Sequence, residues 1–271
     1  MQRSSVPLWQ VDAFTDKPFA GNPAAVCLLR QFPADQWMQD VAAEMNLAET
    51  AFVVPRNQPN VFDLRWFTPV VEADLCGHAT LAAAHVLCEQ SRINPSAPIR
   101  FQTRSGELTC QRSGQNITLD FPATPPDLPV DDVTASQVAD IIGGNAEFIA
   151  RSSFDVFVVA KDERFVRDFL PDFKRIAEIE TRGVIVTAKS DQEGIDYLSR
   201  LFAPRHGINE DPVTGSTHCA LGPYWAGKLG RDDLVGYQAS KRGGTIRTKV
   251  MGDRVLLTGQ AVSIMEAKLF V

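Results

Sequence analysis

The chain has 271 residues, which suffices for one large domain or two modest ones. Hydrophobic residues make up 44% and charged residues 22%, the ordinary balance of a soluble globular protein. The formal net charge is −6 and no basic stripe interrupts it, which argues against a nucleic acid as the main partner.

The segment MQRSSVPLWQVDAF lacks an apolar core of signal-peptide length, and no apolar run approaches the roughly 20 residues that would span a bilayer. The 5 cysteines are odd in number and irregularly spaced, so a disulfide framework is not expected. These features predict a cytoplasmic protein without a membrane partner.

In chain order, apolar–polar alternation predicts strands in PLWQVDAF, AAVCLL, ETAFVV, DLRWFTP, IRFQTRSG, ELTCQRSG and NITLDFP. Strands resume later in FDVFVVA, GVIVTA, YLSRLFAP, GTIRTKV and RVLLTGQAVSIMEAKLF. Helical spacing predicts helices over 34–45, 79–90, 133–142, 162–177, 194–199 and 217–229. The mixture indicates an α+β fold.

The segment PATPPDLPVDD, residues 122–132, is the clearest linker candidate, because its prolines deny it sheet hydrogen bonds. Strands and one helix rich in small residues lie on each side of it. These helices, LCGHATLAAAHVLC from Leu75 and DPVTGSTHCALGPYW from Asp211, both start with a glycine followed by a polar residue. We interpret this pattern as an internal pseudo-repeat.

A helix whose first turn holds a glycine presents unpaired backbone N–H groups, and such ends bind anions. Two of them facing one ligand could hold a carboxylate or a developing enolate without a metal. Gly215 would let the ligand approach the main chain, and Ser216 would add a hydroxyl. The alternative is an ordinary helix start in which Asp211 and Ser216 satisfy the helix donors.

Proton transfer at carbon requires a base, and a carboxylate in a closed site is suited to this task. Glu49, in NLAETAFVV, lies where a helix gives way to an apolar strand. The alternative for Glu49 is a solvated residue at the start of the strand.

The chain resembles the PhzF (phenazine biosynthesis protein) family of the diaminopimelate epimerase fold superfamily. The resemblance is carried nearly end to end by VDAFTDKPFAGNPAAV, LAETAFV, LRWFTP, LCGHATLAAAHVL and FAPRHGINEDPVTGSTHCAL. It implies two pseudo-symmetric halves, each a curved, mostly antiparallel sheet wrapped around a central helix. The expected division is 1–123 and 124–261, with the last strand, 262–271, packing back on the first half and the active site in the cleft between the halves.

The resemblance also implies roles for individual residues. Glu49 matches the family's catalytic acid/base, and His78 and Asp211 match the polar residues that flank the substrate. Backbone and hydroxyl groups that bind the substrate carboxylate are expected at Gly77, Gly215 and Ser216. Asn22, in FAGNPAAV, is a further lining candidate, whereas the acids Glu72 and Glu210 are expected to order the loops.

Epimerases and racemases of this superfamily use two cysteines, one on each face of the stereocentre. Cys76 stands where the first thiol would fall, but the second site offers Asp211 in place of a thiol, and Cys219 lies further along the helix. The resemblance therefore disfavours a two-thiol racemase. Cys76 is either a packed small hydrophobe or a substrate-site residue.

Other sites are disfavoured by spacing. Cys76, His78, His85 and Cys88 on one helix do not form a zinc pattern, and Leu229 stands where a phosphate loop needs Ser or Thr. The pairs Cys76/His78 and Ser216/His218 lack an orienting acid and a nucleophile elbow, so a hydrolase is disfavoured. No metal and no organic cofactor is expected.

The sequence thus predicts a cofactor-independent isomerase that moves a proton between carbons of a small carboxylate, and the resemblance suggests a homodimer. Two alternatives stay open: a small-carboxylate binding protein without turnover, and an epimerase that depends on Cys76. The identity of the substrate, and any link to phenazines, is not specified by these residues.

Overall fold

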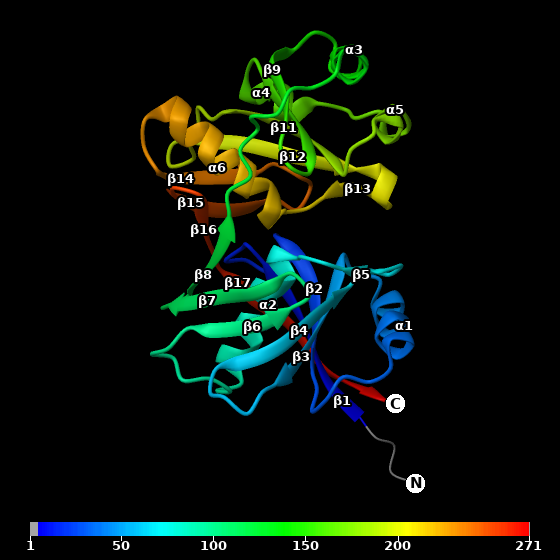
Figure 1. Ribbon diagram of the computed structural model, residues 1–271, viewed down its shortest axis with the longest axis vertical. Coiled ribbons are helices and arrows are strands. Elements are labelled where there is room, and N and C mark those ends of the chain that lie inside the picture. The colour runs from blue at the N-terminus through cyan, green and yellow to red at the C-terminus, as the bar shows by residue number, and fades with distance from the viewer. Residues whose placement is uncertain (1–4, 271) are drawn as a thin grey trace. The chain divides into compact units, whose positions relative to one another are not determined.

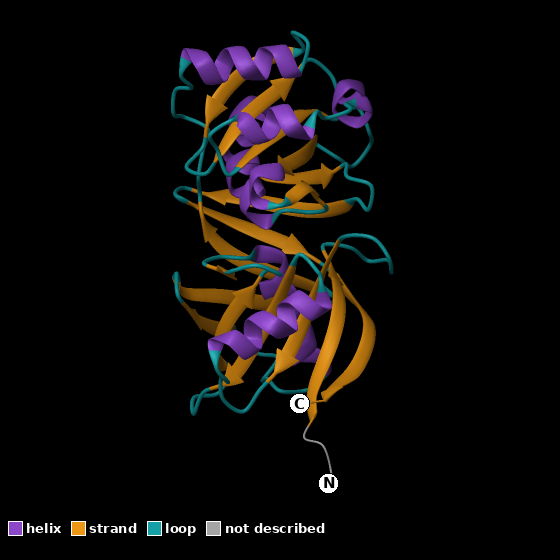
Figure 2. Cartoon of the chain, turned by 90° about the vertical axis from the view of Figure 1, so that its right-hand side faces the viewer, coloured by secondary structure: helices purple, strands orange, loops and turns teal. Residues whose placement is uncertain are grey.

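The computed structural model describes residues 5–270. The chain divides into two compact units, one of Met1–Asp120 with Thr258–Val271 and one of Phe121–Leu257, here called unit 1 and unit 2. Both units combine a mixed sheet with a few helices (Figures 1 and 2). The chain passes from unit 1 to unit 2 in β8 (Asn116–Pro122) and returns in β16 (Arg254–Gly259).

The sheet of unit 1 has the strand order β17–β1–β2–β3–β4–β6–β7–β8, with the short β5 also on β4. The pairs β2–β3 and β4–β6 are parallel and the others antiparallel. The bounds are β1 (Ser5–Ala13), β2 (Asn22–Leu28), β3 (Glu49–Pro55), β4 (Val61–Phe67), β5 (Glu72–Ala73), β6 (Ile99–Thr103), β7 (Gly106–Ser113) and β17 (Ala261–Phe270).

Two helices of unit 1 cover its sheet in different ways. Helix α2 (Gly77–Glu89) packs on β1, β2 and β3 and is buried almost all round, because its small side chains permit close approach from every side. Helix α1 (Asp35–Met45) buries one stripe, in which Met38 and Val41 pack with Phe52 of β3.

Unit 2 repeats the strand pairing of unit 1. Its order is β9–β10–β11–β12–β14–β15, with the short β13 also on β12, and its parallel pairs are β10–β11 and β12–β14. This is the pairing pattern of β1–β2–β3–β4–β6–β7 with β5 on β4. The bounds are β9 (Ala146–Arg151), β10 (Asp155–Ala160), β11 (Gly183–Lys189), β12 (Tyr197–Ala203), β13 (Ile208–Asp211), β14 (Asp233–Gln238) and β15 (Gly244–Met251).

Both faces of the unit 2 sheet are covered, which explains the continuous apolar run FDVFVVA. Val156 and Val158 belong to one core cluster with residues of α3 (Asp132–Ile141), α4 (Glu163–Asp168) and α5 (Phe173–Glu178). Phe157 and Val159 point to the other face, toward α6 (Gly215–Leu229). Each central helix, α2 or α6, directly follows the short strand β5 or β13 with a brief loop between.

Four predicted helices, over 34–45, 79–90, 133–142 and 217–229, agree with α1, α2, α3 and α6 to within two residues. The helix predicted over 162–177 is two helices, since Pro171 falls between α4 and α5. The helix predicted over 194–199 is wrong: β12 begins at Tyr197 and pairs with β11 and β14, and all 7 of its residues are buried. No helix among residues 5–270 is long and apolar enough to cross a membrane.

Candidate active site

Three polar residues of unit 1 meet at the first turn of α2. Asn22 is the first residue of β2, Glu49 is the first residue of β3, and His78 is the second residue of α2. Because β2 and β3 are parallel, both strands start at the same edge of the sheet. The chain fold therefore gathers residues that lie up to 56 positions apart.

The His78 ring lies between the other two side chains. Its Nε2 is 3.0 Å from Oε2 of Glu49, and its Nδ1 is 3.2 Å from Nδ2 of Asn22. The Glu49 oxygen is buried and makes no directed hydrogen bond, so the contact with His78 is a close approach of opposite charges rather than an aligned bond. Catalytic contacts of this kind often align only when substrate is bound. The Glu49 side chain is only 14% exposed, so the interpretation as a solvated residue is wrong.

The surroundings of His78 favour its charged form. Burial alone would lower the pKa of His78, but the neighbouring Cys76 and the carboxylate of Glu49 outweigh burial and raise this pKa well above its usual range. Both neighbours act at short range, since Sγ of Cys76 lies 3.6 Å from Nδ1 of the ring and Oε2 of Glu49 lies 3.0 Å from Nε2. The site thus places a cation against a carboxylate in a nearly dry environment.

Cys76 is the residue before α2, and its Sγ lies 3.6 Å from Nδ1 of His78. Burial, and then the charge of Glu49, raise the pKa of Cys76 to about 11, so its thiol carries a proton at neutral pH. Glu49, Cys76 and His78 each offer one donor atom. These three atoms lie within 4.8 Å of one another, close enough to share a proton or approach one ion. His85, of the disfavoured zinc pattern, instead contacts Glu89 at 3.1 Å.

In unit 2 the corresponding helix start is built from Asp211, Thr214 and Gly215. Asp211 ends β13, Thr214 precedes α6, and Gly215 is its first residue. The Thr214 hydroxyl donates to the Asp211 carboxylate in a short hydrogen bond. The fully buried Gln238 braces this turn, because its Nε2 donates to the Asp211 carbonyl and its Oε1 accepts from the Thr214 N–H, both at 2.8 Å.

Neither central helix has a side-chain cap. Cys76 before α2 and Thr214 before α6 make no capping hydrogen bond, whereas an aspartate caps each of α3, α4 and α5. The N-cap residue of α6 is Thr214, and Asp211 accepts a hydrogen bond from its hydroxyl. The side chains of Cys76 and Thr214 thus take none of the first-turn N–H groups of α2 and α6, and the helix dipole adds positive potential there.

Two arginine–glutamate clamps hold the loops that lead into the central helices. Arg65 of β4 binds both oxygens of Glu72 in β5, at 2.7 and 2.8 Å. Arg200 of β12 binds both oxygens of Glu210 in β13, at 2.7 and 3.0 Å. Glu72 and Glu210 thus order these loops, as predicted.

The two clamps share a short sequence pattern, which lies outside the two helix segments compared in the sequence. RWFTP at 65–69 and RLFAP at 200–204 share the pattern Arg-x-Phe-x-Pro. In both, the guanidinium stacks on the phenylalanine two positions later, with distances to the ring centroid of 5.2 Å and 4.8 Å. The pattern precedes each central helix and supports the pseudo-repeat.

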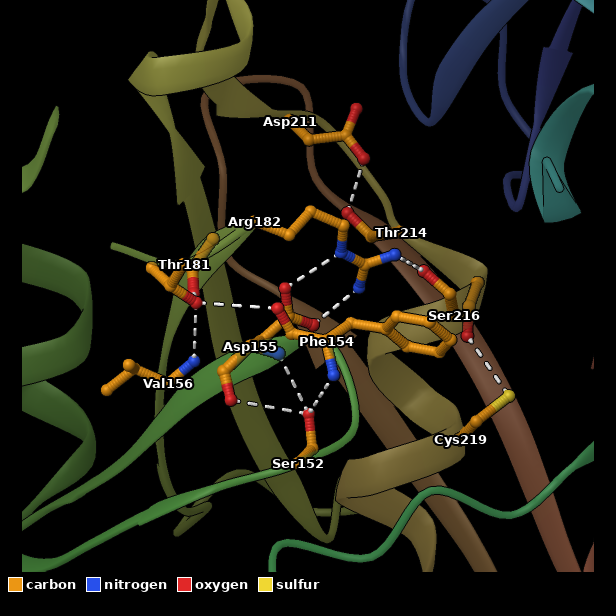
Figure 3. Close-up of polar contacts among 12 residues, drawn as sticks. Ser152, Phe154, Asp155, Val156, Thr181, Arg182, Asp211, Thr214, Ser216 and Cys219 are labelled. Atoms are coloured by element: carbon orange, nitrogen blue, oxygen red, sulfur yellow. Dashed lines mark hydrogen bonds and ion pairs between the residues drawn. The ribbon is translucent and has the colours of Figure 1, made fainter. Parts of the chain in front are cut away.

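Ser216 has a partner that the sequence did not reveal. Nη1 of Arg182 donates to its Oγ at 3.1 Å, and the same guanidinium binds the Asp155 carboxylate and lies over the ring of Phe154 (Figure 3). These residues precede or begin strands and belong to no recognised motif. Only their separation from Ser216 in sequence, 34 positions for Arg182, kept them out of the prediction.

The thiol and histidine of α6 are structural. Sγ of Cys219 donates to the Gly215 carbonyl at 3.8 Å, and burial raises its pKa to about 12. His218 contacts the Tyr197 hydroxyl through Nδ1 at 2.9 Å, and burial lowers its pKa to about 3. Neither residue pairs with Ser216, which agrees with the prediction against a hydrolase.

The chain has an α+β fold with mixed sheets, and solved structures of an epimerase and a racemase share this fold. A hydroxyproline epimerase from Agrobacterium vitis, solved with trans-4-hydroxy-L-proline, has a TM-score of 0.62 at 12% identity over 100% of this chain and 94% of its own. That likeness shows the fold alone.

The chain belongs to the phenazine biosynthesis-like protein family (PhzC-PhzF), whose model matches residues 11–267. An uncharacterized isomerase of Halalkalibacterium halodurans is 47% identical over 265 residues, 98% of each chain. The crystal structure of a PhzF-family protein from Enterococcus faecalis has a TM-score of 0.91 at 38% identity, covering 99% of this chain and 100% of its own. The family expected from the motifs is confirmed, and relatives named as isomerases support that class.

Proposed function

We propose that the protein is a cofactor-independent isomerase that moves a proton between carbons of a small carboxylate-bearing metabolite, with Glu49 as the acid/base. The observation that carries this proposal is the buried contact of Glu49 with His78, 3.0 Å apart, beside the uncapped first turn of α2. A carboxylate held in place without a directed hydrogen bond has a free lone pair to accept a proton.

In the proposed reaction the Glu49 carboxylate removes a proton from carbon and becomes the neutral acid. The electron pair of the C–H bond passes into the π system next to the substrate carboxylate, and Glu49 returns the proton to a different carbon. His78, whose pKa is raised, supports the negative charge that develops. A positioned acid/base contributes about 10²–10⁴-fold to the rate.

We further infer that the Asp211–Ser216 group of unit 2 binds a carboxylate, with the N–H group of Gly215. The uncapped start of α6 and the braced Asp211–Thr214 turn support this role. We infer as well that the two units are pseudo-symmetric halves. Their matching strand pairing and the two arginine–glutamate clamps support that inference.

The test is solvent exchange. Candidate carboxylic acids are incubated with the protein in heavy water, and deuterium in the recovered acid is measured by mass spectrometry. We expect Glu49→Gln to lower the exchange rate by at least about 100-fold, since the amide cannot take the proton. Glu44→Gln, at an exposed position of α1, is the matched control and should exchange like the wild type. Equal exchange by Glu49→Gln and the wild type would remove Glu49 from this role.

The same assay distinguishes the two other functions. A binding protein without turnover would be stabilised against heat by small carboxylates but would show no exchange in the wild type. An epimerase that depends on Cys76 would lose activity in Cys76→Ala. The raised pKa of Cys76 disfavours the latter, because the thiolate is the reactive form.

A further inference from the structure

The polar trio of unit 1 has a counterpart in unit 2 at the same three places of the repeated topology. Asn22 begins β2, and Asp155 begins β10. Glu49 begins β3, and Arg182 directly precedes Gly183, the first residue of β11. The helix residues His78 and Ser216 are each the second residue of the central helix.

One contact is common to the two trios: the residue at the start of the second strand contacts the helix residue, Glu49 with His78 and Arg182 with Ser216. In unit 1, Glu49 and Asn22 both approach the helix residue His78. In unit 2, Arg182 donates to the helix residue Ser216, and Asp155 holds Arg182. The second trio therefore occupies, within its own unit, the place that the acid–base group occupies in the first.

The chemistry of the second trio differs in a way that suits recognition rather than proton transfer. Asp155 is buried, with a side chain only 2% exposed, and both of its oxygens accept from Arg182, at Nε (2.8 Å) and at Nη2. This fork fixes the guanidinium, and the ring of Phe154, 4.9 Å from Cζ, covers one of its faces. One guanidinium nitrogen of Arg182, Nη1, is then left to bind another group.

That remaining nitrogen, Nη1, donates to Oγ of Ser216. Because the hydroxyl oxygen accepts from a cation, the serine proton must point elsewhere, and the hydroxyl becomes a stronger donor. Ser216 lies in the uncapped first turn of α6, next to the N–H of Gly215. Figure 3 shows the Arg182 guanidinium hydrogen-bonded to the Asp155 carboxylate on one side and to Ser216 on the other.

We propose that Arg182, held by Asp155, is a positioning residue that fixes Ser216 as a hydrogen-bond donor to an oxyanion at the start of α6. This inference rests on the proposed function, in which the Asp211–Ser216 group binds a carboxylate. It assigns to the trio of unit 2 the orientation of an anionic group at the start of α6.

The test uses inorganic sulfate as the probe, measured by calorimetry and by thermal shift at constant ionic strength against chloride. We expect the wild type to bind sulfate more tightly than chloride. Arg182→Met and Ser216→Ala should each weaken binding by about tenfold, the effect of losing one charge-assisted or charge-polarised donor. Arg182→Lys should recover part of the affinity, and guanidinium chloride at low millimolar concentration should partly rescue Arg182→Met.

Arg164→Met is the matched control, because the Arg164 side chain is 90% exposed on α4, and it should bind sulfate like the wild type. If Arg182→Met fails to fold because Asp155 is left buried and unpaired, Ser216→Ala carries the test, since it leaves the Asp155–Arg182 pair intact. Wild-type affinity in Ser216→Ala or in a folded Arg182→Met would overturn the proposal. The proposal would also be overturned if the wild type bound sulfate no more tightly than chloride.

The sulfate-binding test and the deuterium-exchange test can each give a negative result without the other. Both proposals are supported if Arg182→Met loses sulfate binding while deuterium exchange by the protein still depends on Glu49. Specific sulfate binding in a protein that exchanges no acid supports the role of Arg182 and contradicts the isomerase.

Discussion

Nδ2 of Asn22 lies 3.2 Å from Nδ1 of His78, and this contact determines which ring nitrogen faces Glu49. When the ring is neutral and the amide group donates to Nδ1, the ring proton resides on Nε2, the atom 3.0 Å from the Glu49 carboxylate. If the ring gains a second proton, Nδ1 becomes a donor, and the Asn22 amide must turn its oxygen toward it. Asn22 can serve both states of His78, which a hydrocarbon side chain cannot.

Asn22→Leu keeps the branched shape of the side chain but removes its polar atoms, and should therefore impair catalysis. We expect deuterium exchange to fall by about tenfold or more, the usual scale for losing a residue that orients a functional histidine. Asn22→Asp keeps an acceptor for the charged ring and should retain more activity than Asn22→Leu, with an even higher pKa for His78. Exchange by Asn22→Leu at the wild-type rate would show that the orientation of His78 does not matter.

His218 should make the protein sensitive to acid. Its pKa is about 3 in the folded state and about 6.5 in the unfolded chain, so below pH 6.5 the unfolded state binds a proton that the folded state refuses. The stabilisation from neutral His218 is complete above pH 6.5 and is lost as pH falls toward 3. The contribution is about 1.4 kcal/mol per pH unit within that window.

The measurement is the free energy of unfolding in urea at several pH values from 4 to 8, for the wild type and His218→Asn. The variant should be less stable at pH 7, because Tyr197 loses its ring partner, but its stability should fall less steeply below pH 6.5. Parallel curves for the two proteins in that range would contradict the assignment.

Gly236 should be intolerant of a methyl group. It pairs with Tyr197 in the β12–β14 ladder, and a Cβ at this position would lie 2.5 Å from the buried Tyr197 ring. The ring has no room to move, so we expect Gly236→Ala to lower the free energy of unfolding by about 1–3 kcal/mol.

Gly227→Ala is the matched control. Gly227 lies within α6, and a Cβ there meets no atom within 4 Å. Alanine should stabilise the helix by about 0.5–1 kcal/mol, and urea unfolding of both variants compares the two effects. A Gly236→Ala variant as stable as the wild type would mean that the sheet yields at this position.

The sequence by itself determined the elements whose signal is local. Apolar–polar alternation predicted most strands, and small residues after a glycine marked α2 and α6. The LAETAFV, CGHAT and EDPVTGS motifs pointed to Glu49, His78 and Asp211 through the family. The helix predicted over 194–199 is wrong, whereas the overlapping strand predicted in YLSRLFAP is β12. A strand buried on both faces has no period-2 pattern to separate it from a helix, which is why both predictions arose there.

Only the tertiary structure decided which side chains meet. His78 faces Asn22 because two strand starts and a helix start share one edge of the unit 1 sheet, and Ser216 receives Arg182 because the same arrangement recurs in unit 2. The absence of side-chain caps on α2 and α6, against the aspartate caps of α3, α4 and α5, also required coordinates. Periodicity reports burial along one segment, whereas partners 30 to 60 residues away depend on strand order and register, about which composition carries no information.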